Sequence, residues 1–207
     1  LTGASSFAEL IDRVVARAST LRAGVAVRGR GWHQSKWLNP PAGHVDGFPT
    51  HRALSEAVPN HPVVLEHANG HSALLNQRAM EQLGIDTDTI APEGGVVVML
   101  DGQPTGLLHE TAIDLAAPLQ TYDLQTAEEL VELAQQHLLS EGITTAHDAG
   151  ALQVDLEAQW AMARRGDLKM RLYSMVYASD EGALSEWLAR GPVIKAGDAK
   201  LTVRSIK

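Results

Sequence analysis

Two kinds of hydrophobic pattern alternate in the last third of the chain. Short runs at 143–147, 169–177 and 201–207 predict strands, the last with two alternating faces and β-branched residues, and the patterns at 154–165 and 181–190 predict helices. The predicted strands begin roughly 26 to 32 residues apart, which is typical of βα units in a parallel sheet. The pattern therefore predicts a parallel βα array here.

The first 125 residues do not keep this spacing. A Ser6–Glu9 capping box predicts a helix with one apolar stripe, and Asp101-Gly102 predicts a hairpin turn. The stripe comprises Leu10, Ile11, Val14, Val15, Ala18 and Leu21, and further strands are expected at 25–28 and 62–67, with helices ending at Pro59 and spanning 73–83. We interpret this part as an irregular α+β layer.

The predicted domains are 1–125, the α+β layer, and 126–207, the βα array. A capping box at Thr126–Glu129 predicts the helix that opens the second domain, and Gly142 ends it. A (β/α)8 barrel needs about 250 residues and eight strands. Three predicted strands leave two alternatives open, a small doubly wound sheet or an arc of a barrel.

Both ends of the chain are abrupt. The predicted strand at 201–207 has no turn or polar tail after it, and Leu1-Thr-Gly-Ala leads straight into a helix. We expect a piece of a larger protein whose site is only partly present. An arc of strands would expose edges near Leu201, Val203, Ile206 and Ile143, so a homodimer is one expected way to cover them.

Composition excludes several classes of function. The net charge of −8 argues against nucleic acid or an anionic membrane as a partner. The absence of Cys excludes disulfides, thiol nucleophiles and thiolate metal sites. No apolar run approaches the roughly 18 residues of a spanning helix, and no signal-peptide pattern is present, so a cytoplasmic location is favoured.

His147-Asp148 is the first candidate for chemistry. The pair is expected where a parallel strand gives way to its loop, ahead of Ala149-Gly150. Active sites lie at that carboxyl edge in both barrels and open α/β sheets. The alternative is a His that caps a loop and an Asp that caps the next helix.

The second candidate is the segment from His67 to His71. Two His four residues apart can bind zinc on a helix, but Asn69-Gly70 breaks a helix at this point. We expect His67 to end a strand, Asn69-Gly70 to form a turn, and His71-Ser72 to open a helix. A His at such a turn can face a ligand or simply bond backbone.

Three further features have both a plain and a functional interpretation. His44, Asp46 and His51 are interpreted as a solvated loop, with metal binding as the lesser alternative. Glu110 is explained by a favourable position near a helix N-terminus. Lys207 would be an ordinary solvated amine, unless burial at a strand end keeps it neutral and able to form a carbamate with carbon dioxide.

These segments, in this order, resemble the YtcJ-like branch of the amidohydrolase-3 family, which includes N-substituted formamide deformylase and the exoenzyme regulatory protein AepA. The matching stretches are Gly31–Trp37, Pro62–Ser72, Asn76–Met80 with Gly84-Ile85, Gly94-Gly95, Gly102–Glu110 and Gly142–Gly150. The resemblance implies a metal-dependent (β/α)8 barrel, present here as about strands two to four with an inserted α+β layer. Asn69 departs from the family, which usually has Asp before Gly-His-Ser.

The resemblance also implies roles for individual residues. Lys207, carbamylated in the longer parent, would be a metal ligand, and the metal would be divalent, with zinc preferred. His147 and Asp148 would be catalytic. The substrate-binding residues would be Trp32, His71 and Glu110.

The activity implied for the parent is hydrolysis of a C–N bond, of the amide or formamide kind, in a small molecule. The fragment lacks most of the ligands, so we expect it to bind no metal and to be inactive. The alternative is a non-catalytic regulatory or binding module. Further His and Asp residues in the sequence of the parent would favour the enzyme.

Overall fold

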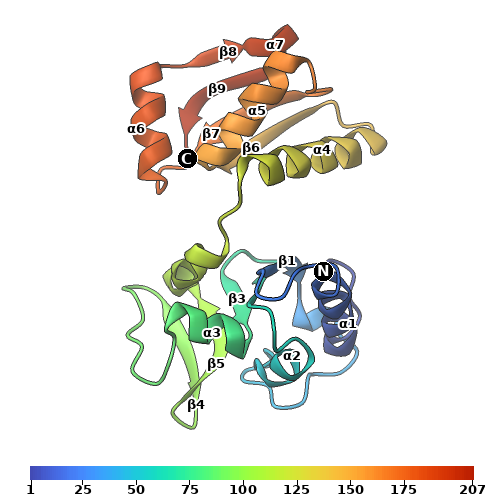
Figure 1. Cartoon of the computed structure of the whole chain (residues 1–207), viewed down its shortest axis with the longest axis vertical. Coiled ribbons are helices and arrows are strands. Elements are labelled where there is room, and N and C mark those ends of the chain that lie inside the picture. Colours follow the sequence, from blue (N-terminus) through green and yellow to red (C-terminus); the bar gives the residue numbers. More distant parts are fainter. The chain divides into compact units, whose positions relative to one another are not determined.

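The computed structural model describes residues 1–207, which form two compact units. The first unit is Leu1–Thr121 and the second is Tyr122–Lys207 (Figure 1). None of the helices has the length and apolar character needed to cross a lipid bilayer.

A five-stranded mixed sheet forms the centre of the first unit, with strand order β1-β2-β3-β5-β4. Its strands are β1 (Val27–Trp32), β2 (Val63–His67), β3 (Ser72–Leu75), β4 (Val96–Leu100) and β5 (Gln103–His109). Its helices are α1 (Phe7–Ala18), η1 (Gln34–Lys36), α2 (Arg52–Ala57), α3 (Gln77–Leu83) and η2 (Glu110–Leu119), where η marks 3₁₀-helices. β1 and β2 are parallel, and the other neighbouring strands are antiparallel.

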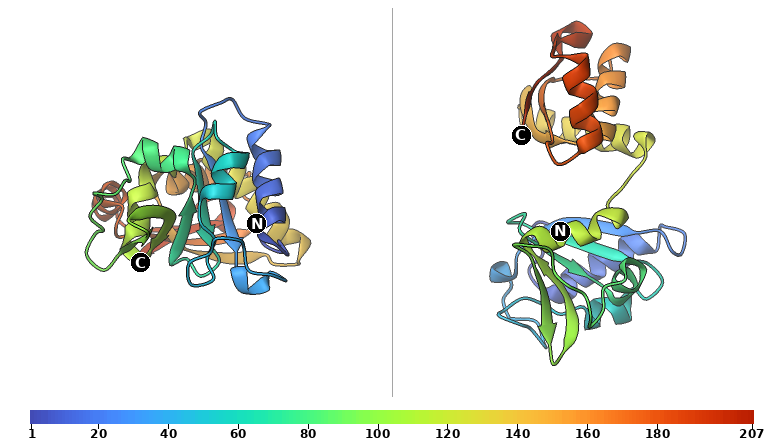
Figure 2. Two further views of the ribbon diagram at one scale, coloured as in Figure 1. Left: turned by 90° about the horizontal axis from the view of Figure 1, so that it is seen from below. Right: turned by 90° about the vertical axis from the view of Figure 1, so that its left-hand side faces the viewer.

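Helices cover both faces of this sheet (Figure 2). Leu65 packs in a cluster with residues of α1 and α2, whereas its neighbour Val64 packs in a second cluster with residues of α3 and η2. Successive strand residues point to opposite faces, so β2 must be apolar throughout to satisfy both layers. The first unit therefore has two cores, one on each side of its sheet.

The first unit contains the predicted cap of α1 and the predicted hairpin turn. Ser6 caps α1 as predicted by accepting the Glu9 N–H at 3.0 Å, but the Glu9 carboxylate accepts from Ser5 instead of closing the box. Asp101 and Gly102 form the predicted hairpin turn between β4 and β5, and both have positive φ (+53° and +75°). A two-residue turn of this kind matches the twist of the strands that it joins.

The predicted helix at 73–83 is wrong in its first part. Ser72–Leu75 is strand β3, and the helix α3 begins only after Asn76, whose side chain accepts the Ala79 N–H. All four residues of β3 are buried because both faces of the strand are covered. A continuous apolar run of that length does not distinguish a buried strand from a buried helix. His71-Ser72 therefore leads into a strand.

The second unit contains a four-stranded sheet of order β6-β7-β9-β8. Its strands are β6 (Thr145–Ala151), β7 (Arg171–Val176), β8 (Val193–Lys195) and β9 (Leu201–Ile206), and its helices are α4 (Leu124–Ser140), α5 (Gln153–Arg165), α6 (Glu181–Arg190) and α7 (Ala196–Ala199). β6, β7 and β9 are parallel, whereas β8 pairs antiparallel with β9. The predicted parallel βα array is present.

Helices lie on one face of β6, β7 and β9 (Figures 1 and 2). Leu201 and Val203 are buried there against residues of α5 and α6, including Leu156 and Trp187. The prediction that Leu201 and Val203 lie at an exposed edge is therefore wrong. The opposite face, which has no helix, is called the open face below.

Three local predictions in the second unit need correction. Asp123, and not Thr126, caps α4, because its carboxylate accepts the Thr126 N–H at 2.8 Å. The first strand lies at Thr145–Ala151, two residues later than predicted at its start and four at its end. The short strand β8 was not predicted, because its three residues are too few to show a period.

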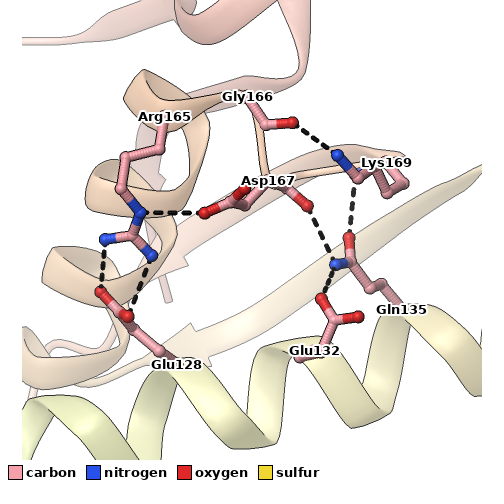
Figure 3. A network of polar contacts seen from close by, with 7 residues as sticks. All are labelled: Glu128, Glu132, Gln135, Arg165, Gly166, Asp167 and Lys169. Carbon is pink, nitrogen blue, oxygen red and sulfur yellow. Dashed lines mark hydrogen bonds and ion pairs between the residues drawn. The ribbon is translucent and has the colours of Figure 1, made fainter.

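A polar network joins α4 to the connection between α5 and β7 (Figure 3). Arg165 donates to both carboxylate oxygens of Glu128 and to Asp167, each at 2.9 Å. The buried Gln135 amide donates to the Asp167 carbonyl at 3.0 Å and accepts the Lys169 N–H at 2.9 Å. Gln135 satisfies backbone groups that would otherwise be buried without partners, so it fixes this connection.

Candidate functional site

The carboxyl ends of β6, β7 and β9 lie at the same edge of the second unit's sheet, and Lys207 directly follows β9. Its N–H donates to the Val176 carbonyl at 2.9 Å, and its own carbonyl accepts the Ala178 N–H at 2.9 Å. The side chain is exposed and has no hydrogen bond or ion pair. A Cβ placed on Gly150 would lie 3.8 Å from the Lys207 Cδ, so this amine stem runs beside the end of β6.

His147 lies on the open face of β6. Its ring stacks on the ring of Tyr173, with centroids 5.0 Å apart and planes at 25°, and its side chain is exposed. The expectation that His147-Asp148 lies at the end of its strand is wrong, because β6 continues to Ala151. His147 therefore lies in the middle of β6, which is an edge strand of the sheet.

Asp148 points to the other face of the sheet. Its carboxylate accepts from Gln159 of α5 at 2.9 Å, and the Gln159 carbonyl accepts from Ser174 at 2.6 Å. Burial raises the pKa of the Asp148 carboxyl above its usual range, and the Gln159 hydrogen bond opposes that shift. Adjacent strand residues face opposite ways, so His147 and Asp148 cannot act as one pair.

In the first unit, the carboxyl ends of β1, β2 and β5 meet the start of β3. Trp32 pairs with His67 across β1 and β2, and Ser72 pairs with His109 across β3 and β5. Four histidines gather at this edge of the sheet. They are His33, His67, His71 and His109, referred to below as the histidine cluster.

Ring contacts connect three members of the histidine cluster, His33, His67 and His109. The His67 ring lies 4.5 Å from that of His33 and 5.7 Å from that of Phe48, which in turn lies 5.2 Å from His109. His67 is buried, and its Nε2 is 2.8 Å from the Gln34 Oε1. Burial, and then the neighbouring His33 and His109, lower the pKa of His67, although a hydrogen bond with Asn69 opposes the shift.

His71 and Glu110 form an exposed pair within this group. The His71 Nδ1 lies 2.9 Å from the Glu110 Oε2, and the Glu110 N–H donates to the His71 carbonyl at 3.0 Å. Ser72 and His109 make a second contact of 2.8 Å between Oγ and Nδ1. A carboxylate at Nδ1 fixes the orientation of an imidazole and leaves Nε2 free to exchange a proton or contact a ligand.

Trp32 is a core residue of the first unit. It is 1% exposed, its Nε1 donates to the Leu65 carbonyl at 3.0 Å, and its ring stacks on Trp37 at 5.8 Å. His33 and His109 were not singled out from the sequence. Each directly follows or ends a strand whose carboxyl end lies at this edge, which is the signal that could have identified them.

The loop residues His44, Asp46 and His51 do not form a site. The Nδ1 of His44 accepts the Gly47 N–H at 3.2 Å, and the Nδ1 of His51 lies 3.0 Å from the Ser55 Oγ. No three His, Asp or Glu side chains of the chain are grouped so that they could hold a metal ion. The donors present do not make a complete metal centre.

The sequence profile of the amidohydrolase family matches residues 1–207. The chain belongs to this family. It is 28% identical over 182 residues to a protein named "Putative amidohydrolase YtcJ" from Bacillus subtilis, which covers 84% of the chain and 33% of that protein. It is 31% identical over 149 residues to N-substituted formamide deformylase from Arthrobacter pascens, covering 68% of the chain and 26% of that protein.

A third relative is the protein LONG AFTER FAR-RED 3 of Arabidopsis thaliana, to which the chain is 30% identical over 152 residues. This alignment covers 72% of the chain and 25% of that protein. The chain thus spans about a quarter to a third of the curated relatives that it matches. Among solved structures, uncharacterized metal-dependent hydrolases of Pyrococcus horikoshii and Pyrococcus furiosus share the fold. Their TM-scores are 0.65 and 0.60 at 22% and 24% identity, and the alignments cover all of this chain and 37% and 38% of theirs.

Proposed function

We propose that this chain is a segment of a hydrolase that cleaves a C–N bond in a small molecule. The family membership and the names of two relatives, an amidohydrolase and a formamide deformylase, support this reaction class. The observation that carries the proposal is Lys207, an unpaired amine held at the carboxyl edge of three parallel strands. Enzymes with parallel α/β sheets place their chemistry at that edge.

The proposed architecture is a partial (β/α)8 barrel. β6, β7 and β9 would be consecutive barrel strands, about the second to the fourth, and the first unit would be an insertion. Their parallel order and the crossover helices α5 and α6 support this assignment. In such a barrel the open face of this sheet would line the interior.

The proposed cofactor of the longer protein is a divalent metal, with zinc preferred. Metal-dependent hydrolases among the structural neighbours support the metal. The residues of this chain do not complete a metal centre, so we assign no metal-dependent step to them. We assign Lys207 as one ligand through its carbamate, and His147 as a residue lining the same site.

The substrate-binding roles proposed for His71 and Glu110 are supported by their hydrogen bond. Glu110 orients the exposed imidazole, which can then present Nε2 to a polar group of the substrate. Trp32 would act only indirectly, by supporting His67 from the core with ring centroids 4.7 Å apart. Asp148, which faces α5, is left out of the proposed site.

Turnover of an amide panel by the longer protein tests this proposal. The panel should include N-substituted formamides, and the variants should be Lys207→Ala and, as a control, Lys195→Ala, an exposed lysine on β8. We expect the wild type to hydrolyse at least one amide, K207A to have a kcat/KM lower by about 100-fold or more, and K195A to keep the wild-type value. Absence of hydrolysis across the panel, or full activity in K207A, would contradict the proposal.

A further inference from the structure

His67 ends β2 inside the histidine cluster, and both of its ring nitrogens have partners. The backbone N–H of Asn69 donates to Nδ1 at 3.2 Å, and Nε2 lies 2.8 Å from the Gln34 Oε1. Because a backbone N–H can only donate, Nδ1 must be the unprotonated nitrogen, and the proton of the neutral ring is on Nε2. The Nε2–H therefore donates to the carbonyl oxygen of Gln34. His67 is 2% exposed, so both contacts are made away from water.

The Asn69 N–H is the first link in a chain of contacts that leads to His71. The side-chain Oδ1 of Asn69 accepts the His71 N–H at 2.7 Å, and the Gly70 N–H donates to the His67 carbonyl at 3.0 Å. Gly70 has a φ of +74°, which glycine adopts without the strain that a side chain would add. These bonds fix the turn, and the turn sets where the exposed His71 imidazole meets Glu110.

A proton on Nδ1 of His67 is incompatible with this turn. The Asn69 N–H and the new Nδ1–H would both be donors, placed where one of the two groups must accept. The hydrogen bond would be lost and the two donors would repel each other, so Asn69 would move away from the ring. The turn would then lose the side-chain contact that joins it to the end of β2.

The rings that surround His67 do not stabilise a positive charge on it by ion pairing. Trp32 of β1 and Phe48 contact it with uncharged rings, at centroid distances of 4.7 and 5.7 Å. Its titratable neighbours are His33 and His109, which add repulsion when they are charged. Burial, followed by these two histidines, lowers the pKa of His67, so the ring is neutral at pH 7 and becomes charged in acid.

The carboxylates nearest in sequence and in the turn are engaged elsewhere. Glu110 pairs with His71 at 2.9 Å. Glu66 precedes His67 on β2 and points to the opposite face of the sheet, where its carboxylate lies 3.9 Å from a guanidinium nitrogen of Arg30. A proton on His67 therefore has no carboxylate partner, and its main consequence is the loss of the Asn69 bond.

We propose that His67 is a positioning residue that makes the placement of His71 depend on pH. With Nδ1 unprotonated, His67 holds Asn69 and thereby His71, and it releases both when it takes up a proton. This inference rests on the proposed function, in which His71 binds the substrate, and adds regulation of that site. Substrate binding should weaken in acid, when the turn is released.

Two replacements of His67 separate its acceptor from its charge. Asn places an amide oxygen near the position of Nδ1 and does not titrate, whereas Gln reaches the position of Nε2 and leaves the Asn69 N–H without a partner. His67→Asn should therefore keep the turn in acid, and His67→Gln should lose it at every pH. His61→Asn is the matched control, because His61 is also buried, precedes β2, and places its Nδ1 2.8 Å from the Val25 carbonyl.

Nuclear magnetic resonance of the 207-residue chain between pH 8 and 4 tests the coupling. Ring ¹⁵N shifts give the tautomer and charge of His67, and hydrogen exchange gives the protection factors of the Asn69 and His71 amides. We expect the proton on Nε2 at pH 8, and protection that falls about tenfold with the midpoint of the His67 titration. This fall should be absent in H67N and present in H61N. A neutral ring protonated on Nδ1, protection that does not follow the titration, or a fall that persists in H67N would overturn the proposal.

Kinetics of the longer protein separate this inference from the proposed function. We expect the KM for the hydrolysed amide to rise about tenfold in the wild type as His67 is protonated, with a smaller change in kcat, and to lose this rise in H67N. Hydrolysis with the same pH dependence of KM in both proteins would reject the regulation and keep the hydrolase. Coupled titration of the turn without hydrolysis of any amide would keep the positioning by His67 and reject the hydrolase.

Discussion

The two sheets of this chain differ in how their faces are covered. The sheet of the first unit is packed by helices on both sides, and β2 and β3 are buried almost throughout. The parallel strands of the second unit are packed on one side only, and their open face carries Arg, Tyr, His and Thr. Both faces of the first sheet are thus packed into hydrophobic cores, whereas the second sheet has one face with polar side chains that no helix covers.

The largest expected effect separates these two environments. Leu65→Ala should lower the free energy of unfolding of the first unit by about 2–5 kcal/mol, because Leu65 is 0% exposed between two layers. Met175→Ala on the open face should cost clearly less, because Met175 is only partly buried and has no layer above it. Urea unfolding followed by tryptophan fluorescence measures both, since Trp32 and Trp37 report on the first unit and Trp160 and Trp187 on the second. Similar losses of unfolding free energy in L65A and M175A would contradict the proposed difference in packing between the two sheets.

The next effect tests what holds the helical side of the second unit. Gln135→Ala should destabilise this unit by about 1–3 kcal/mol, because the Asp167 carbonyl and the Lys169 N–H lose their buried partner. Gln136→Ala, which removes an exposed amide from the same helix, is the control. Equal unfolding midpoints for the two variants would show that the hydrogen bonds of Gln135 do not stabilise the second unit.

Two buried groups, His67 in the first unit and Asp148 in the second, should respond to acid in opposite directions. In the first unit, the pKa of His67 is lowered below 6.5 by burial, so the unfolded chain binds a proton before the folded one does. Stability contributed by neutral His67 is therefore lost as the pH falls below 6.5 through the folded pKa. His67→Gln should flatten this part of the pH dependence, as measured by urea unfolding between pH 7 and 5. The same pH dependence of stability in H67Q and the wild type would contradict this role of His67.

In the second unit, the sign is reversed for Asp148. Its folded pKa is raised by burial above the ordinary 3.8, so the folded state holds a proton that the unfolded chain has already released. The stability of this unit should therefore fall as the pH rises from 3.8 through the folded pKa. Asp148→Asn should be more stable than the wild type at pH 7 and lack this slope. Lower stability of D148N at pH 7 would show that the charged form is the favoured one.

The smallest expected effect is weak self-association of the chain. Leu188, Ile194 and Ile206 remain exposed near α6, β8 and β9, so we propose a concentration-dependent homodimer that covers them. Sedimentation equilibrium should show association that decreases in Leu188→Glu. Ile90→Glu, at an exposed apolar position of the first unit, is the control. A monomer at all concentrations would contradict the homodimer.

The regular part of the fold could be predicted from the sequence because local signals agree there. The helix at 181–190 was predicted with the bounds that the structure shows, and the helix predicted at 154–165 is α5, which begins one residue earlier. β3 could not be recognised because burial on both faces removes the alternation of a strand. The shift of β6 to Thr145–Ala151 had a different cause, since Ala149, Gly150 and Ala151 show little strand preference.

The site was only partly accessible from the sequence. His71 and Glu110 lie 39 positions apart, and only the pairing of β3 with β5 brings them into contact. The His147-Asp148 pair illustrates the opposite error, because neighbours in sequence were expected to act together and point to different faces.

Metal analysis of the longer protein tests most directly the claim that Lys207, at the carboxyl edge of the second unit's sheet, belongs to the reactive site. Wild type, Lys207→Ala and Lys195→Ala would be purified without chelator and their bound metal measured by mass spectrometry. We predict a divalent metal in wild type and K195A, a loss of about tenfold or more in affinity for it in K207A, and none held by the 207-residue chain alone. Full metal occupancy and affinity in K207A, or no metal in the wild type, would contradict the account.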